Sequence, residues 1–420
     1  MSETEVITVP RPLLLPDGRP AAHAWSLDPA LKHLNHGSFG AVPVVAQERQ
    51  SALRAEMERA PVVWFPALPQ RIAAARTELA AFLGVPADDL ALVSNASAGA
   101  SVVYAGLTRR RGGEIVVTDH GYGAVTMGAE RLARRWGGRV RTARVPLDAG
   151  EEQAYEAVVA ELGEATDLVV VDHITSATAR RMPVARIGEA ARRRGIPLLV
   201  DGAHAPALLD GPLDGVNCDF WVGNLHKWGC APRGTAALVA RGPLRDQLYP
   251  LIDSWGAADP YPDRFDQQGT VDATACLAAP TALDFIERTW GWDDARRYMD
   301  GLADYGAHVI GTAFAELSGA GAGDDVGTRV DVGMPVPGMR LVRLPDGLGS
   351  DRVDADALRD RVARELDVEA AFTSFGGIGY MRLSAHVYNT PADYEYFAEA
   401  SVPVLGEWAR AARERKRSEG

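Results

Sequence analysis

Two side chains of complementary chemistry follow apolar runs of the sequence. Asp201 comes directly after the run 196–200, Lys227 lies shortly after the run 220–222, and a third apolar run covers 236–239. Each run is bounded by Gly, Pro, Asn or Asp, a pattern typical of buried strands. In open α/β sheets the ligand crevice lies outside the carboxyl ends of the strands. We therefore expect Asp201 and Lys227 to face the same site.

An amine and a carboxylate in one site are the pair that pyridoxal phosphate (PLP) requires. The amine forms a Schiff base with the aldehyde, and the carboxylate keeps the pyridinium nitrogen protonated so that the ring accepts electrons. Lysine occurs only at positions 32, 227 and 416, although Lys and Arg together number 44. Arginine cannot take this role because it stays protonated. Lys227 is thus the predicted cofactor lysine, and a solvated loop lysine is the alternative.

A turn of small residues is a candidate phosphate site. The short apolar run 90–93 leads directly into SNASAGASVVYAGL, which predicts a strand followed by a helix. Backbone N–H groups at a helix N-terminus bind anions, and small side chains allow close approach. This predicts that Ala96, Ser97 and Ala98 bind the cofactor phosphate. Ser and Asn are also ordinary helix N-caps, which is the structural alternative.

A further predicted strand, 114–117, ends in TDHGYGAV and offers two rings, His120 and Tyr122. Either ring could stack on a bound pyridine ring, and His120 could instead be a hydrogen-bonded structural histidine. Tyr122 could also act as a general acid toward a leaving group.

Three motifs in this order carry a family resemblance: VDGAHAP (200–206), GNLHKW (223–228) and APRGTA (231–236). They resemble the class V aminotransferases of PLP fold type I, within them the branch of isopenicillin N epimerase-like enzymes and ergothioneine-type C–S lyases. The likeness extends from about Leu34 to Asn389. It implies an α/β fold, with a mostly parallel sheet between helices in a large domain and a smaller α+β C-terminal domain. The repeated strand–helix–strand order agrees with such a sheet.

The resemblance also implies roles for further residues. Ser176 and His204 would lie near the phenolic oxygen of the cofactor, and Asn224 and His226 would help to bind its phosphate. The DHEYGA pattern of the family favours Tyr122 as the stacking ring, with Gly121 in place of the glutamate. Thr270 would reach the phosphate in the other subunit of a homodimer. Val271 stands where many relatives have the arginine of GTRD.

Two substrate-binding candidates lie near the ends of the chain. The segment LNHGSFGAVP predicts a fixed loop and not a helix, because of its Asn, Gly and Pro residues. In the resembling enzymes it crosses the active-site mouth, so that His36 would touch substrate; a loop held by local hydrogen bonds is the alternative. Arg382 matches the family's RxSxxxYN pattern. An arginine on a strand suits a substrate α-carboxylate, and a surface salt bridge is the alternative.

Length and composition restrict the domain number, the partners and the localisation that can be expected. The 420 residues suggest more than one domain, which we divide by resemblance into an N-terminal arm over the active site (1–40), a large PLP-binding domain (41–284) and a small domain (285–420). The net charge of −12 argues against nucleic acid or an anionic membrane as partner. Three cysteines form neither a disulfide framework nor a zinc spacing, so no metal is predicted. Without a signal peptide or an apolar span, a cytoplasmic enzyme is expected.

The motifs leave several reactions open. A lysine released from the cofactor could remove the α-proton of an amino acid, and epimerisation, transamination, decarboxylating oxidative deamination or β-elimination could follow. We favour a C–S β-lyase acting on an S-conjugated cysteine or its sulfoxide, because LNHGSFG and DHGYGA resemble ergothioneine-type lyases. A cysteine desulfurase is disfavoured because 368–381 contains no cysteine. A non-catalytic scaffold would have no need for Asp201, Lys227 and Arg382 together.

Overall fold

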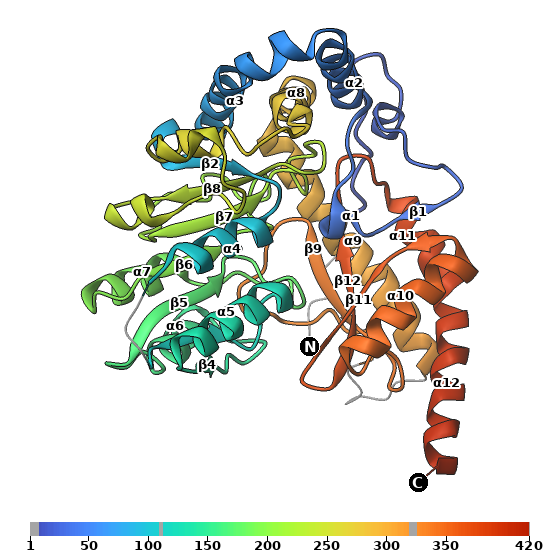
Figure 1. The fold of residues 1–420 in the computed structure, drawn as a ribbon. Coiled ribbons are helices and arrows are strands. Elements are labelled where there is room, and N and C mark those ends of the chain that lie inside the picture. Colours follow the sequence, from blue (N-terminus) through green and yellow to red (C-terminus); the bar gives the residue numbers. More distant parts are fainter. Residues whose placement is uncertain (1–7, 109–111, 319–325, 420) are drawn as a thin grey trace. The chain divides into compact units, whose positions relative to one another are not determined.

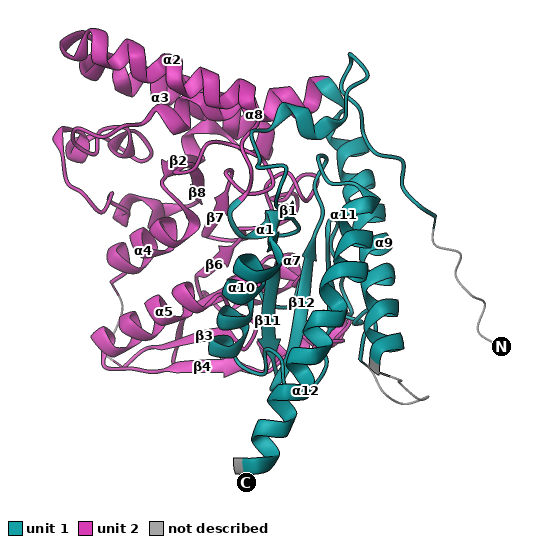
Figure 2. Cartoon of the chain, turned by 90° about the vertical axis from the view of Figure 1, so that its right-hand side faces the viewer, with its two compact units in different colours: residues 1–39, 177–179, 289–420 teal, residues 40–176, 180–288 magenta. Residues whose placement is uncertain are grey.

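The computed structural model describes residues 8–108, 112–318 and 326–419. The chain divides into two compact units, coloured separately in Figure 2. The large unit comprises residues 40–176 and 180–288, and the terminal unit comprises residues 1–39, 177–179 and 289–420. Among the residues described, no helix is long and apolar enough to cross a membrane.

A seven-stranded sheet forms the large unit, in the order β2-β8-β7-β6-β5-β3-β4 (Figure 1). The ladder from β7 to β4 is parallel, whereas β8 is antiparallel to both of its neighbours. This confirms the predicted α/β fold with a mostly parallel sheet. The strands are β2 (Leu90–Val93), β3 (Glu114–Thr118), β4 (Val140–Ala143), β5 (Thr166–Asp172), β6 (Leu198–Asp201), β7 (Phe220–Asn224) and β8 (Ala236–Ala240).

Alternation of side chains along these strands supplies two apolar faces. Residues such as Val117, Val170 and Phe220 pack with the helices α4 (Ala96–Gly106) and α5 (Gly123–Trp136) in one buried cluster. The helices α6 (Glu151–Val159) and α7 (Val184–Arg193) contact β3, β5 and β6. The central strands are buried except for the partly exposed Asp167 of β5, because both faces are covered. Their apolar runs are for this reason nearly continuous, which is what made them predictable.

The large unit also contains α2 (Val44–Arg59), α3 (Pro61–Leu83) and α8 (Thr274–Thr289). The sequence predicts a helix over 70–83, and α3 contains it but begins at Pro61, a favourable first position for proline. It continues through Pro66 and Pro69, where buried Trp64 and Leu68 hold its early turns in the core.

The terminal unit has a three-stranded antiparallel sheet in the order β11-β12-β9. The helices α9 (Trp292–Ser318), α10 (Arg352–Leu366), α11 (Pro391–Tyr396) and α12 (Val402–Glu419) accompany β9 (Met339–Arg343), β11 (Ala371–Phe375) and β12 (Ile378–Ser384). The two-residue strands β1 (Lys32–His33) and β10 (Val368–Glu369) pair in parallel and join the N-terminal segment to this unit. The strand expected to carry Arg382 is confirmed as β12.

One local prediction was wrong. The segment around His36 was predicted as a loop, but His36–Phe39 forms a single helical turn, α1. Asn35 stabilises this turn from both its backbone and its side chain. Its carbonyl accepts the Ser38 N–H at 3.3 Å, and its Oδ1 accepts the Ser38 hydroxyl at 2.7 Å. A side chain of this type at a helix start compensates for poor helix formers within the turn.

Candidate active site

Polar side chains gather at the carboxyl ends of three neighbouring parallel strands in the large unit. Asp172 is the last residue of β5, Asp201 the last of β6 and Asn224 the last of β7. Asp172 and Asp201 are direct partners in the β5–β6 ladder. Lys227 follows β7 by three residues and is 9% exposed. The predicted meeting of Asp201 and Lys227 at one sheet edge therefore matches the strand order.

Lys227 lies in a tight turn that the backbone fixes. Both Leu225 and His226 donate their N–H groups to the Thr235 carbonyl at 3.2 and 3.3 Å, and Cys230 donates to the Lys227 carbonyl at 3.0 Å. The lysine Nζ lies 3.1 Å from Nε2 of His204. The amine is thus held close to a buried imidazole.

Asp201 is a buried carboxylate with one oxygen still available. Its Oδ1 accepts the Ala203 N–H at 3.0 Å, but its buried Oδ2 has no hydrogen-bond partner among the described residues. Burial raises the pKa of Asp201. It also raises the pKa of Asp172, with a further contribution from Asp201. Burying two adjacent carboxyls, one of which has an oxygen without a hydrogen-bond partner among the described residues, is costly, so the site is suited to a hydrogen-bond donor from a bound group.

The small-residue turn after β2 is fastened to β7. Asn95 caps α4 by accepting the Ala98 N–H at 2.8 Å, and Asn224 Oδ1 accepts the Ala96 N–H at 2.8 Å. At Gly99 a Cβ would lie 2.6 Å from Cγ1 of Val222, so only glycine lets α4 pack this closely. The N-terminus of α4, with Ser97 and Ala98 partly exposed, is thereby placed at the same edge as Asn224.

We expect Asn224→Asp to weaken retention of an anionic cofactor by about 10- to 100-fold, because a negative charge would replace the amide beside the N-terminus of α4. The substitution keeps an oxygen that can accept the Ala96 N–H, so the turn itself should persist. Equilibrium dialysis of PLP would measure the change. Asn217→Asp, an exposed substitution of equal charge, is the control; equal loss in both variants would contradict the assignment.

His226 and His120 make contacts that fix their ring protons. Nδ1 of His226 lies 3.0 Å from the Thr235 carbonyl, and Nε2 of His120 lies 2.8 Å from the Val145 carbonyl. A carbonyl only accepts, so each of these nitrogens carries a proton. Burial lowers the pKa of His226 to about 4, and a neutral His226 can donate to a phosphate only if it gains a second proton. The His120 contact fits a structural role.

The other predicted residues of the large unit are more exposed than Asp201, Asn224 and Lys227. Tyr122 is the N-cap residue that precedes α5 and is 43% exposed, and its N–H donates to Asp172 Oδ1 at 3.2 Å. Ser176 is partly exposed beyond the end of β5. Thr270 is exposed on the surface of this unit, which is where a residue that reaches a second subunit would have to be.

Arg382 belongs to the terminal unit, on the central strand β12, and is 3% exposed. Its Nη2 donates to Asn35 Oδ1 at 3.2 Å and to Ser38 Oγ at 3.0 Å. Because Ser38 also donates to Asn35, these two residues fix one corner of the guanidinium group.

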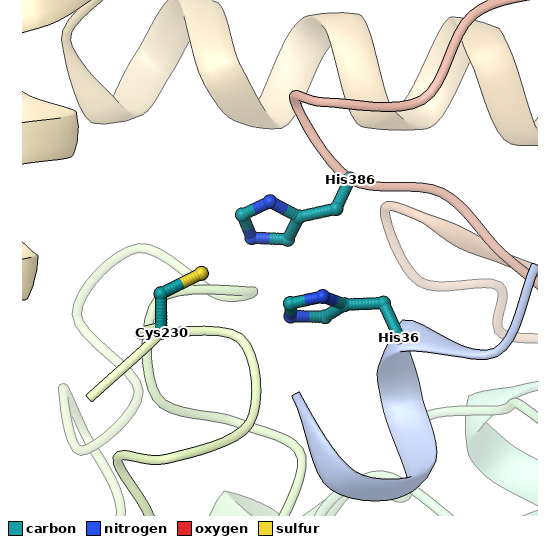
Figure 3. Close-up of side chains that lie close together, drawn as sticks. All are labelled: His36, Cys230 and His386. Carbon is teal, nitrogen blue, oxygen red and sulfur yellow. The ribbon is translucent and has the colours of Figure 1, made fainter. Parts of the chain in front are cut away.

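His36 lies in the sequence between Asn35 and Ser38, the two residues that bind Arg382, and is 3% exposed. Its ring stacks on His386 with centroids 3.9 Å apart (Figure 3). Its Nδ1 is 3.0 Å from the Tyr388 hydroxyl. Asn389 joins the two segments, because its Nδ2 donates to the His33 carbonyl at 2.8 Å. The predicted substrate-side residues His36 and Arg382 thus belong to one hydrogen-bonded cluster of the terminal unit.

Comparison with known proteins assigns the chain to a class. Solved structures similar in fold include a lysine-to-alanine mutant with glycine covalently linked to its PLP cofactor, at a TM-score of 0.76 and 20% identity, covering 92% of this chain and 99% of that chain. A cystine C–S lyase in complex with its product cysteine persulfide has a TM-score of 0.74 at 20% identity. The match covers 90% of this chain and 97% of that chain. This likeness shows that the fold is PLP fold type I.

Sequence relatives refine this class. Residues 47–313 match the Aminotransferase class-V family model. Isopenicillin N epimerase of Streptomyces clavuligerus is 33% identical over 411 residues, 91% of this chain and 96% of that protein. A probable chloroplastic L-cysteine desulfhydrase of Arabidopsis thaliana is 27% identical over 407 residues, which cover 89% of this chain and 82% of that protein. The chain belongs to the class-V aminotransferase family, and its cofactor is PLP.

The chemistry of the site fits this cofactor. The buried, unpartnered Oδ2 of Asp201 suits a protonated ring nitrogen, the N-terminus of α4 suits a phosphate, and Lys227 suits an aldehyde.

Several residues of these networks were not predicted from the sequence: Asp172, Trp228, Asn35 and His386. For Asp172 a signal was present, because DLVVVD ends in aspartate as IPLLVD does. The others are identified only by their partners in the fold.

Proposed function

We propose that this enzyme is a PLP-dependent C–S β-lyase that acts on L-cysteine carrying a substituent on sulfur, or on its sulfoxide. The observation that carries the proposal is the Lys227–His204–Asp201 cluster in a unit whose cysteines are unsuited to attack. The likeness to L-cysteine desulfhydrases supports cleavage of the bond between Cβ and sulfur. With an S-substituted cysteine the overall reaction consumes water and gives a thiol, pyruvate and ammonia, and with the sulfoxide a sulfenic acid is formed in place of the thiol.

When bound, PLP withdraws electrons from the α-carbon of an amino acid and so weakens its bonds. Lys227 in its neutral form would take the α-proton on Nζ, as a general base. Asp201 would hold a proton on the ring nitrogen through its negative charge. His204 would keep Nζ of Lys227 in place through the contact of its Nε2 with that atom. With the cofactor bound, cleavage of the bond between Cβ and sulfur would release a thiolate, or a sulfenate from the sulfoxide, and Tyr122 is the proposed proton donor to that leaving group.

The thiols argue against sulfur transfer to the protein. Burial raises the pKa of Cys218 to about 12 and that of Cys276 to about 11, and it also raises the pKa of Cys230. These thiols are protonated at neutral pH and are poor nucleophiles. The segment before Arg382 is a tight hairpin turned by Gly376 and Gly377, with φ of 59° and 81°. It has no cysteine-bearing loop, as the sequence predicted for an enzyme other than a desulfurase.

Arg382 is the proposed partner of the substrate α-carboxylate. We expect Arg382→Gln to raise KM by about 100-fold with a much smaller change in kcat, because two charge-assisted hydrogen bonds to the carboxylate would be lost. Steady-state kinetics would measure both constants.

Arg340→Gln provides the matched control for this prediction. Arg340 is a second buried arginine of the same sheet, paired with Asp300 and Asp304 at 2.7 Å. Its loss should lower the melting temperature and leave KM nearly unchanged. If Arg382→Gln lowers stability without raising KM, Arg382 has a structural role.

Amino-acid epimerisation is the second candidate, favoured by the identity to isopenicillin N epimerase. It requires reprotonation of Cα from the face opposite Lys227, for which Tyr122 is the proposed acid.

We also propose that the active form is a homodimer in which exposed Thr270 reaches the phosphate site of the second subunit, a state that light scattering would detect.

One experiment distinguishes the two reactions. The enzyme would be incubated in heavy water with a panel of S-substituted L-cysteines and their sulfoxides, and the products analysed by mass spectrometry. Pyruvate, ammonia and free thiol would support the lyase. Intact substrate with deuterium at Cα and inverted configuration would support epimerisation and overturn the lyase for that substrate.

A further inference from the structure

His204 lies between the indole of Trp228 and the amine of Lys227 in the large unit. Trp228 Nε1 donates to His204 Nδ1 at 3.3 Å. On the other side of the ring, His204 Nε2 is 3.1 Å from Lys227 Nζ. Trp228 is fully buried and His204 is 1% exposed. The three side chains form a short hydrogen-bonded chain that ends at the amine.

The indole fixes the tautomer of this histidine. An indole N–H can only donate, so Nδ1 of His204 must be the nitrogen without a proton. A neutral imidazole then carries its proton on Nε2. That proton points at Lys227 Nζ, which must accept it through a lone pair. Only a neutral amine has a lone pair, so this arrangement selects the uncharged form of Lys227.

The opposite proton arrangement would break the chain. A charged ammonium group at Lys227 has three donors and no acceptor, so Nε2 would have to accept and Nδ1 would have to carry the proton. Two N–H groups would then face each other between His204 and Trp228. The buried indole would lose its acceptor, which is unfavourable away from water.

Other charged groups act on the same amine. Asp201 and Asp172 lie at the adjacent strand ends and favour a charged lysine electrostatically. His226, next to Lys227 in the turn, stays neutral, because burial and, to a smaller extent, positive charge at Lys227 and Arg233 lower its pKa to about 4. The hydrogen bonds through His204 therefore favour neutral Lys227, whereas the two carboxyls favour charged Lys227. Loss of these hydrogen bonds should shift Lys227 toward the charged form.

We propose that Trp228 is a positioning residue that, by setting the tautomer of His204, holds Lys227 as a neutral amine ready to bind the cofactor. The inference rests on the proposed role of Lys227 as the cofactor lysine. In that step the Nζ lone pair would form a bond to the aldehyde carbon of PLP, and the aldehyde oxygen would leave as water with the two hydrogens of the neutral amine. A lysine that is already neutral needs no prior deprotonation.

The test is the pH dependence of cofactor capture by the full chain after its PLP has been removed. Capture at each pH would be quenched with borohydride, and the modified peptide containing Lys227 would be quantified by mass spectrometry. We expect Trp228→Phe to shift the midpoint of the profile upward by about one pH unit and to slow capture at neutral pH about tenfold, with an unchanged plateau at high pH.

Trp221→Phe is the matched control. Trp221 is also fully buried, but its Nε1 has no hydrogen-bond partner among the described residues. The same loss of volume there should leave the midpoint of capture unchanged. In a His204→Asn background, Trp228→Phe should add no further shift, because the indole acts through the imidazole. A Trp228→Phe profile that coincides with that of Trp221→Phe would overturn the proposal.

A second measurement does not depend on the folding of the Trp228 variant. Side-chain nitrogen-15 spectra of the cofactor-free wild-type protein, with His204 assigned by the signal missing in His204→Asn, report the tautomer directly. A neutral ring protonated at Nε2 is expected, and protonation at Nδ1 would overturn the inference. If wild-type protein captures PLP on another lysine or on none, the proposed function itself fails.

Discussion

Lys227→Ala should lower turnover by at least about 1,000-fold, because the variant lacks the amine that we propose as both the covalent partner of the cofactor and the general base. The buried site around His204 offers no second amine at the same place. After borohydride reduction, wild-type protein should carry the cofactor mass on the peptide containing Lys227, and the variant should carry none. Turnover would be measured with the best substrate of the S-substituted cysteine panel.

The sequence provides the controls for this prediction, since lysine occurs at only two other positions, 32 and 416. Lys32 forms an ion pair with Asp393 at 3.4 Å in the terminal unit, and Lys416 lies in the last turn of α12. Lys32→Ala and Lys416→Ala should keep both the covalent cofactor and activity. Covalent modification that persists in Lys227→Ala would show that the cofactor lysine has been misassigned.

Asp201→Asn is expected to have opposite effects on activity and on stability. Turnover should fall by about 100- to 1,000-fold, because the preorganised charge that we propose to act on the cofactor ring is lost. In contrast, the cofactor-free variant should be more stable at neutral pH, by about 1 kcal/mol, because a buried carboxylate with an unpartnered oxygen beside Asp172 is replaced by a neutral amide. Kinetics and chemical denaturation of the cofactor-free protein would measure the two effects.

The sign of the pH dependence follows from the raised pKa of Asp201. Between the ordinary aspartate pKa and the raised pKa in the folded protein, the folded state binds more protons than the unfolded state. The stability of the cofactor-free protein should therefore fall as pH rises through this window. The fall should be smaller in Asp201→Asn. Asp219→Asn is the control, because its carboxylate accepts the Leu198 N–H at 2.9 Å at the other end of the strands. An equal change in slope in both variants would contradict this account of Asp201.

The sequence alone determined the elements on which the site is built. The buried strands β5, β6 and β7 could be predicted because both faces of the sheet are covered, which makes their apolar runs nearly continuous. Strand ends in a parallel sheet lie at one edge, so the positions of Asp201 and Lys227 after two such runs were enough to predict that they meet. The chemical difference between lysine and arginine then indicated the cofactor.

Tertiary structure decided the partners of these residues. That Asp172 lies directly beside Asp201 depends on the β5–β6 register, which no local pattern encodes. The contact of Trp228 with His204 joins positions 24 residues apart, and that of Arg382 with Ser38 joins positions 344 residues apart. The helical turn at His36, predicted as a loop, depends on the hydrogen bonds of Asn35 and on its place beside β12. Sequence spacing identifies residue types and strand ends, but proton positions and charge balance depend on which atoms folding brings within hydrogen-bond distance.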